Sequence, residues 1–592
     1  MTTEEIDNTS NVSELSENLT KIEELSQRFI SALSQREQIH PGLQAPGQDL
    51  FLKAASAYFS EAVTHPAKIL ESQVEYWGKT LAHYVEAQQN LFRLEAPEDP
   101  GLKDARFANE VWDTHPYFNY VKQQYLFSAG MIRDAVDKLD DLDESDKKRV
   151  RYFSQQIIDM MSPTNFLGTN PEALAKAAET NGQSLVHGLE NLVRDIENSD
   201  GELLVSLADK DAFEVGKNIG ATEGSVVFRN EIFELIQYAP TTETVHKTPL
   251  LIFPPWINKF YILDLKPKNS LIKWIVDQGY TLFVVSWKNP DASYRDFGLD
   301  DYVETGYLTA IDTVKKITVE PQVNVVGYCI AGTTLSLTLG MLQKRGDKSV
   351  KSATFFTTLT DFGDQGEVGV FLANDFVDAI EEQVAKDGIL KSFIMSRTFS
   401  FLRSNDLIYG PAIRSYMLGE APPAFDLLYW NGDGTNLPAC MLMEYLRGLC
   451  QENRFARDGF EVLGETVTIK DVEVPLCAIA CETDHIAAWS TSYTGVRQMG
   501  SRSKKFILSE SGHIAGIVNP PSKKKYGHYL NETWSDDWQE WRDAAKFNQG
   551  SWWPTWEDWL APRSGKMIAA REPGNESFPV IGNAPGLYVA ES

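Results

Sequence analysis

The chain has 592 residues, 43% of them hydrophobic, which is enough for two or more globular domains with a large core. Its 83 acidic residues outnumber its 55 basic ones and give a formal net charge of -28, which excludes a general nucleic-acid binder because phosphate requires a basic surface. The five cysteines lack CxxC spacing, so neither a disulfide framework nor a metal site is predicted. No apolar run reaches the roughly 18 residues of a membrane span, and the acidic start is not a signal peptide.

The first third of the sequence is predicted to be mostly helical. Residues 1–12 are polar and are expected to be disordered, and the apolar spacing over 15–33 predicts an amphipathic helix. That helix either docks on its own domain or binds a partner or a surface. Helical spacing continues to about residue 210 without a catalytic cluster, so we assign residues 1–214 to a mostly α-helical N-terminal domain.

Beyond this region, short apolar segments alternate with helical ones. Buried strands are predicted at 250–253, 282–286 and 323–326, with helical spacing between them. This alternation is typical of an α/β fold with a mostly parallel sheet, which we assign to residues 215–592. Residues 361–470 interrupt the alternation with a mixed, aromatic stretch that is too long for a loop and that predicts a cap (lid) insertion.

The turn that follows residues 323–326 carries the first chemical motif, which reads Gly327-Tyr-Cys329-Ile-Ala331-Gly332. Small residues on both sides of a nucleophile are typical of the strand–turn–helix elbow of α/β-hydrolases, here with cysteine in the serine position. The small residues let strand and helix approach, and the helix N-terminus favours a thiolate. The pattern alone is also compatible with a glycine-rich turn around an inert cysteine.

The order of three residues favours the catalytic interpretation. An α/β-hydrolase presents its nucleophile, acid and histidine in that order, each after a successive strand. Cys329 follows one predicted strand, Asp484 follows a later one, and His513 follows the strand at 505–508. We predict that His513 deprotonates Cys329 and that Asp484 orients the imidazole. His485, next to the acid, competes for the role of base and is otherwise a substrate contact.

An oxyanion hole requires two N–H donors. One is expected at Ile330, directly after the nucleophile, and the other in the loop after the first core strand. That loop begins with two prolines, which have no N–H, so the donor lies at Trp256 or beyond, and we predict Ile257.

The choice of cysteine over serine indicates a class of reaction. An acyl group on cysteine is itself a thioester, so exchange from a thioester donor onto Cys329 is nearly isoenergetic. The stored energy then remains for transfer to an alcohol. The sequence therefore favours acyl transfer over hydrolysis, although cysteine hydrolases exist.

The motifs together resemble those of the single-subunit, class I polyhydroxyalkanoate (PHA) synthases, and the resemblance covers most of the chain. The box around Cys329 is similar to the family's lipase-like box, although Ala331 stands where the family usually has glycine. Further segments that resemble the family lie at 106–107 with Trp112, 162–166, 254–265, 286–291, 401–406, 430–433 with 435–438, 484–486, 511–521 and 550–554.

The resemblance implies polymerisation of (R)-3-hydroxyacyl-CoA, such as 3-hydroxybutyryl-CoA, into polyester with release of CoA, by Cys329, Asp484 and His513. It implies no cofactor, since the CoA thioester is the substrate, and no contact with nucleic acid or the membrane interior. It also implies a cytoplasmic homodimer associated with PHA granules and their proteins. Arg403 is a candidate contact for CoA or for the cap, with a plain surface ion pair as the alternative.

Two other functions stay open on the sequence. A cysteine-dependent thioesterase or polyester depolymerase would use the same three residues with water as the acceptor. A non-catalytic granule or scaffold protein would keep the helical domain, but the intact set of Cys329, Asp484 and His513 argues against it.

Overall fold

The chain divides into two compact units in the computed structural model, which describes residues 17–18, 20–32, 34, 39–43, 104–139, 142–199 and 201–591. The first unit comprises Met1–Asp209 together with Arg397–Pro423, and the second comprises Lys210–Ser396 together with Ala424–Ser592. The first unit's N-terminal part ends at Asp209, close to the predicted boundary after residue 214. The predicted disorder of residues 1–12 falls outside the described residues.

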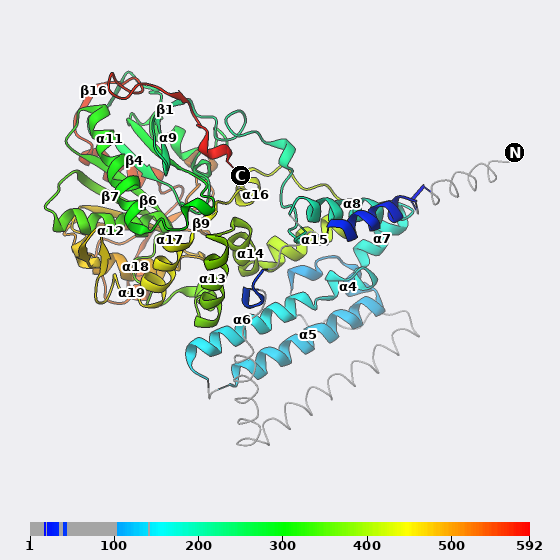
Figure 1. The fold of residues 1–592 in the computed structure, drawn as a ribbon. Coiled ribbons are helices and arrows are strands. Elements are labelled where there is room, and N and C mark those ends of the chain that lie inside the picture. Colours follow the sequence, from blue (N-terminus) through cyan, green and yellow to red (C-terminus); the bar gives the residue numbers. More distant parts are fainter. Residues whose placement is uncertain are drawn as a thin grey trace. The chain divides into compact units, whose positions relative to one another are not determined.

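The first unit is helical in its described part (Figure 1). Its two long helices, α5 and α6, pack side by side, and Pro116 starts α5 at the position where a missing N–H costs nothing. Asp143 caps α6 by accepting a hydrogen bond from the Asp146 N–H. The α-helices contributed by the N-terminal part are α4 (Val111–Thr114), α5 (Pro116–Asp137), α6 (Glu144–Met160), α7 (Pro171–Glu179) and α8 (Gln183–Glu197).

Residues 20–32 form a helix that docks within the first unit, as one of the two interpretations of its sequence predicted. Arg28 donates two hydrogen bonds to the Glu197 carboxylate, at 3.0 and 2.7 Å, and Lys21 pairs with Glu190 on α8. Leu25, on the same helix, is buried. These ion pairs place the helix against the chain's own α8.

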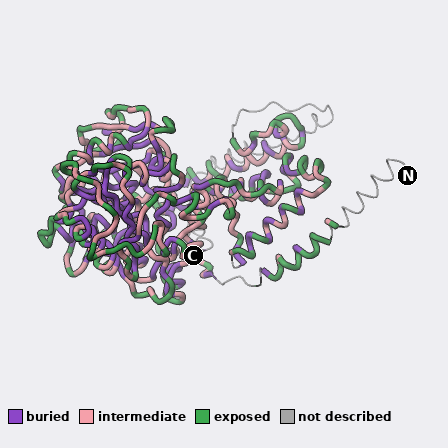
Figure 2. Tube along the Cα trace, turned by 90° about the horizontal axis from the view of Figure 1, so that it is seen from above, coloured by how far each residue is buried: buried purple, intermediate pink, exposed green. Residues whose placement is uncertain are grey.

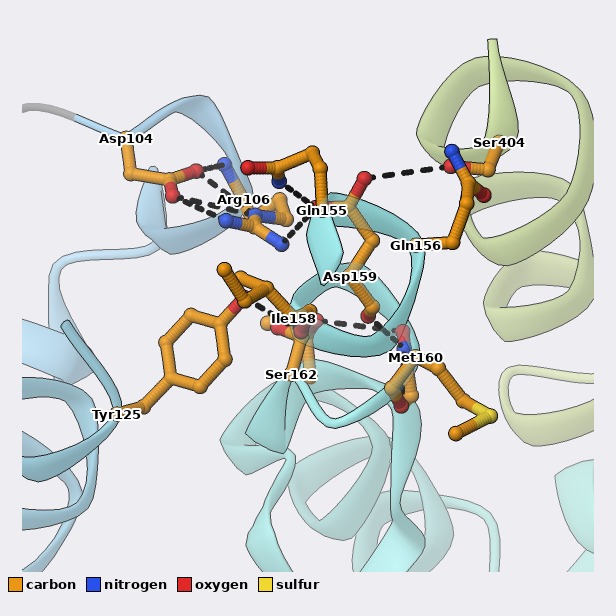
Figure 3. A network of polar contacts seen from close by, with 12 residues as sticks. Asp104, Arg106, Tyr125, Gln155, Gln156, Ile158, Asp159, Met160, Ser162 and Ser404 are labelled. Carbon is orange, nitrogen blue, oxygen red and sulfur yellow. Dashed lines mark hydrogen bonds and ion pairs between the residues drawn. The ribbon is translucent and has the colours of Figure 1, made fainter. Parts of the chain in front are cut away.

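The internal segment 397–423 is fastened to the N-terminal helices by a polar network (Figure 3). Arg106 pairs with Asp104 at 2.6 Å and with Asp159 at 3.0 Å. The other carboxylate oxygen of Asp159 accepts a hydrogen bond from the Ser404 hydroxyl at 3.3 Å. Asp159 is buried, so these donors replace the hydrogen bonds to water that its carboxylate loses on folding.

The second unit is built on a sheet with the strand order β15-β14-β13-β12-β7-β6-β4-β5-β2-β1-β17. The six strands from β13 to β5 in this order are parallel, and antiparallel strands extend the sheet on both sides. The parallel strands are β4 (Leu250–Phe253), β5 (Leu282–Trp287), β6 (Val323–Tyr328), β7 (Val350–Phe356), β12 (Leu476–Cys481) and β13 (Lys504–Ser509). The flanking strands are β1 (Gly224–Arg229), β2 (Phe233–Tyr238), β14 (His528–Leu530), β15 (Lys546–Asn548) and β17 (Gly582–Asn583).

The parallel strands form the core because they are covered on both faces. Every residue of β4, β5, β6 and β12 is buried, and their sequences are nearly continuous apolar runs, as expected for strands between two layers. Figure 2 shows the buried residues, in purple, gathered in the interior of this unit. Helices that connect and cover the sheet include α9 (Leu271–Asp277), α11 (Thr309–Thr318), α12 (Ile330–Lys344), α18 (Trp489–Gln498), α19 (Trp538–Asp543) and α20 (Trp553–Leu560).

Residues 361–470, predicted to form one cap insertion, are shared between the two units. Their middle part, 397–423, packs with the N-terminal helices, whereas the parts before and after it belong to the unit with the sheet. The elements on the sheet side include α13 (Asn374–Asp387), the start of α14 (Ser392–Leu402), α16 (Asp426–Asn431), α17 (Ala439–Met443), β10 (Phe460–Val462) and β11 (Glu465–Val467). In the described parts of both units, no helix is long and apolar enough to cross a bilayer.

Candidate active site

Cys329 sits at a sharp turn between β6 and α12. The strand ends at Tyr328 and the helix begins at Ile330, so a single residue makes the turn. Cys329 adopts φ 54° and ψ -126°, a conformation that costs a residue with a side chain on the order of 1–3 kcal/mol. Its N–H donates to the Phe356 carbonyl at 2.8 Å, which anchors the strained residue to β7. The Cys329 side chain is half-buried at this turn.

Two glycines make the turn possible. A Cβ on Gly327 would lie 2.6 Å from the Gly332 Cα, and a Cβ on Gly332 would lie 2.0 Å from the Thr358 Oγ1. Both distances are below any real contact, so strand and helix meet here without side chains between them. Ala331 is fully buried and its carbonyl accepts a hydrogen bond from Tyr307, so alanine fits where the resembling family usually has glycine.

His513 and Asp484 are paired in the same unit. The His513 Nδ1 lies 2.7 Å from the Asp484 Oδ2, and the Asp484 side chain is fully buried. The other carboxylate oxygen, Oδ1, accepts hydrogen bonds from the N–H groups of Ile486 and Ala487, both at 2.8 Å. The two backbone N–H groups hold the Asp484 carboxylate in place, and the carboxylate in turn orients the imidazole of His513.

His513 lies beside the nucleophile turn, because its ring stacks on that of Tyr328, the residue before Cys329, at a centroid distance of 6.0 Å. Burial lowers the pKa of His513, but the Asp484 carboxylate and the Cys329 sulfur raise it well above the usual value of about 6.5, and the hydrogen bond to Asp484 contributes. An imidazole with a raised pKa is suited to accept a proton from a neighbouring group. The structure thus brings together the three residues that the sequence order predicted.

The loop after β4 lies beside this turn. Phe253, the last residue of β4, is in register with Gly327 of β6, so the two strands end side by side. The indole N–H of Trp256 donates to the hydroxyl of Thr334, on α12, at 3.3 Å. Ile330 is the first residue of that helix, and its N–H has no acceptor within the helix. Ile257 follows Trp256 and is half-buried.

Two family models match the chain. The family model described as the poly-beta-hydroxybutyrate polymerase (PhaC) N-terminus matches residues 103–275, and the alpha/beta hydrolase fold model matches residues 249–520. The poly(3-hydroxyalkanoate) polymerase of Methylorubrum extorquens is 41% identical over 531 residues, which are 89% of this chain and 87% of that protein.

Two further relatives are named poly(3-hydroxyalkanoate) polymerase subunit PhaC. The protein from Rhizobium etli is 37% identical over 579 residues, covering 96% of this chain and 91% of that one. The protein from Cupriavidus necator is 40% identical over 495 residues, covering 82% and 83%. The chain belongs to the poly(3-hydroxyalkanoate) polymerase family. Membership confirms the family resemblance and the α/β-hydrolase fold, and it makes the chain an enzyme of the acyltransferase-type polymerase class.

Tryptophans of the C-terminal region hold the loop that carries His513. The indole N–H groups of Trp552 and Trp553 donate to the carbonyls of Gly516 and Ile517, at 2.7 and 2.9 Å. A Cβ on Gly516 would lie 2.4 Å from the Cys481 sulfur, so the loop packs tightly on β12. The sequence showed a tryptophan-rich tail but gave no sign that it supports the histidine.

Tyr445 is an aromatic residue that packs on the loop after β4 and that the sequence did not single out. Burial raises its pKa well above the usual value, and Cys450 and Cys329 contribute in the same direction. Its ring packs edge-on against Trp256 and Phe362, at centroid distances of 5.8 and 6.0 Å. No spacing in the sequence distinguishes this tyrosine from an ordinary core residue.

The two predicted substrate contacts have different positions. His485 is half-buried in the turn after β12, next to Asp484. Arg403 is exposed at the end of α14 and belongs to the first unit, not to the unit that carries Cys329. Both residues stay predictions.

Proposed function

We propose that this family member polymerises (R)-3-hydroxyacyl-CoA, in particular short-chain substrates such as 3-hydroxybutyryl-CoA, into polyester through thioesters on Cys329. The observation that carries the proposal is the strained Cys329 turn with His513 and the buried Asp484 behind it, in a chain that belongs to this family. Polymerisation of hydroxyalkanoates follows from the family, whereas the thioester chemistry and the substrate length are proposed here.

In the first step, the Cys329 thiolate attacks the carbonyl carbon of the acyl-CoA. The tetrahedral oxyanion is stabilised by the N–H groups of Ile330 and Ile257. The C–S bond to CoA then breaks, and the CoA thiolate takes the proton that His513 received from Cys329. The products are free CoA and an acyl thioester on Cys329.

In the second step, the hydroxyl of one acyl unit attacks a thioester carbonyl on Cys329. His513 accepts the hydroxyl proton, a C–O ester bond forms, and the C–S bond to Cys329 breaks. The sulfur leaves as a thiolate, ready for the next acyl-CoA. Repetition of the two steps lengthens the polyester.

Asp484 acts on the substrate hydroxyl through His513 in this proposal. Its Oδ2 is engaged by His513, and its Oδ1 accepts two backbone N–H bonds, so it has the environment of an orienting carboxylate.

The remaining substrate contacts and partners are proposed on the family resemblance. His485 and Arg403 are candidate contacts for the acyl-CoA, and no cofactor is required because the CoA thioester supplies the energy. We further propose a cytoplasmic homodimer that associates with PHA granules and their proteins. Sedimentation at several protein concentrations and co-purification with granules test these two proposals.

The decisive experiment follows thiol release and product together, with 3-hydroxybutyryl-CoA as substrate. Purified wild type is expected to release CoA continuously and to form insoluble polyester, and Cys329→Ala is expected to do neither. Release of CoA with free hydroxy acid would instead identify a thioesterase. Equal CoA release by Cys329→Ala would refute the proposed nucleophile.

A further inference from the structure

We propose that Thr435 is the positioning residue of the oxyanion hole, because its hydroxyl sets the direction of the Ile257 N–H. The inference rests on the proposed function, in which that N–H stabilises the oxyanion. Thr435 does not touch the reacting atoms in this proposal and acts only through the loop after β4.

Thr435 makes two hydrogen bonds to adjacent carbonyls of that loop. Its Oγ1 donates to the Trp256 carbonyl at 2.7 Å, and its backbone N–H donates to the Ile257 carbonyl at 3.0 Å. The neighbouring residues Asn258 and Gly434 form an isolated antiparallel bridge, so the two segments run alongside each other. One residue thus holds two successive peptide units.

The planarity of the peptide bond turns the first contact into a directional constraint. The Trp256 carbonyl and the Ile257 N–H belong to the same peptide unit, and in a trans peptide they point in opposite directions. Because Thr435 holds the carbonyl on its own side, the Ile257 N–H points away from Thr435. Rotation of this peptide would break a buried hydrogen bond.

The carbonyls on either side are held in the same way by other elements. The Trp287 indole N–H donates to the Pro254 carbonyl at 2.7 Å, and the Trp430 indole N–H donates to the Lys259 carbonyl at 2.7 Å. These contacts anchor the ends of the loop. Among the described residues, the hydroxyl of Thr435 is the hydrogen-bond donor to the carbonyl of the peptide that contains the Ile257 N–H.

Burial gives the contact its strength. Thr435 and Trp256 are each only 1% exposed, so water cannot replace the hydroxyl as a donor to the carbonyl. The peptide is therefore held in place before the substrate arrives, which is the condition under which an oxyanion hole contributes most.

The test uses a near-isosteric change with a matched control. Thr435→Val removes the hydroxyl but keeps the backbone N–H bond to Ile257, and Thr435→Ser restores the hydroxyl. Thr318→Val is the control, because Thr318 is also buried and donates at 2.7 Å to a backbone carbonyl, that of Val314 in α11. The control contact is part of a helix and not of the loop after β4.

Two reactions of Cys329 separate the oxyanion hole from the rest of the site. Acylation by 3-hydroxybutyryl-CoA passes through an oxyanion, whereas alkylation by iodoacetamide, followed by mass spectrometry of the Cys329 peptide, does not. Thr435→Val is expected to lower the maximal rate of acylation about tenfold or more, with a half-saturating substrate concentration within about twofold of wild type. Its alkylation rate should match wild type, and Thr435→Ser should recover most of the acylation rate.

The proposal is overturned if Thr435→Val acylates at the wild-type rate, if it loses acylation and alkylation equally, or if Thr318→Val shows the same selective loss. These outcomes differ from a failure of the proposed function. If Cys329→Ala still releases CoA, the nucleophile is wrong, whereas an inactive Cys329→Ala beside an unaffected Thr435→Val overturns only the role of Thr435.

Discussion

Gly332 has no room for a side chain, since an added Cβ would lie 2.0 Å from the hydroxyl oxygen of Thr358. We expect Gly332→Ala to push α12 away from the turn, to lower the free energy of unfolding by about 1–3 kcal/mol and to abolish CoA release. Urea unfolding and the CoA assay measure the two effects. Gly130→Ala is the control, because this helical glycine has no atom within 4 Å of an added Cβ, and it should be neutral or slightly stabilising.

Asp484 stabilises the protonated form of His513, so its charge supports the transfer of the thiol proton. In Asp484→Asn the carboxylate no longer raises the pKa of His513, and the imidazole holds that proton less tightly. We expect iodoacetamide to alkylate Cys329 at least about tenfold more slowly at neutral pH than in wild type. An unchanged alkylation rate would show that Asp484 has no part in activating the thiol.

Lys259 links stability to pH. Burial lowers its pKa, and the Asp433 and Glu591 carboxylates only partly oppose this. The folded chain therefore binds this proton less tightly than the unfolded chain, so its contribution to stability rises with pH from the lowered pKa towards the ordinary 10.5. Wild type should gain more stability than Lys259→Met between about pH 8 and about pH 10, as measured by urea unfolding. Equal changes in the two proteins would contradict the prediction.

The sequence could predict the three candidate catalytic residues, because the fold places them in a fixed order along the chain. Cys329, Asp484 and His513 each follow a buried strand, and parallel strands bring such positions to one edge of a sheet. Thr435 could not be found in this way, because it comes from the region predicted to be the cap and its proposed role depends on a contact with the loop after β4. Tyr445 comes from the same region and packs on Trp256 of that loop.

At the scale of elements, the short helix α20 and the residues before it support the histidine loop. Trp552→Phe should keep the ring packing and lose the hydrogen bond to Gly516, which costs about 1 kcal/mol and loosens the loop of His513. We expect CoA release to fall several-fold. Trp556→Phe is the matched control, because its N–H bonds to Thr354 in β7 and not to that loop. Similar losses of activity in both variants would contradict a specific role for Trp552.

The parallel strands were predictable as elements because short apolar runs of four to six residues that alternate with helical segments are typical of a sheet covered on both faces. The strands β14, β15 and β17 were not, since each has only two or three residues and none is a continuous apolar run. These strands pair with the outer strands of a sheet that has already formed. Their own sequences do not show that such a partner exists.

At the scale of the whole molecule, the Asp159 network decides how firmly the internal segment is attached. We expect Asp159→Ala to leave Arg106 with Asp104 alone, to cost about 1–3 kcal/mol and to speed hydrogen exchange in 397–423. Arg151→Ala is the control, because its pair with Asp137 is exposed and is worth less than about 1 kcal/mol. Unchanged exchange in 397–423 would show that other contacts hold the segment.

The membership of residues 397–423 in the first unit also sets an order of events during synthesis. A ribosome delivers the N-terminal helices first, then residues 210–396 of the other unit, and only afterwards the segment that completes the first unit. The N-terminal helices must therefore wait for a part that is still untranslated. A gene cut after Asp209 would encode a helical fragment without its own last piece, so exchanging this region between relatives requires two transplanted segments and not one.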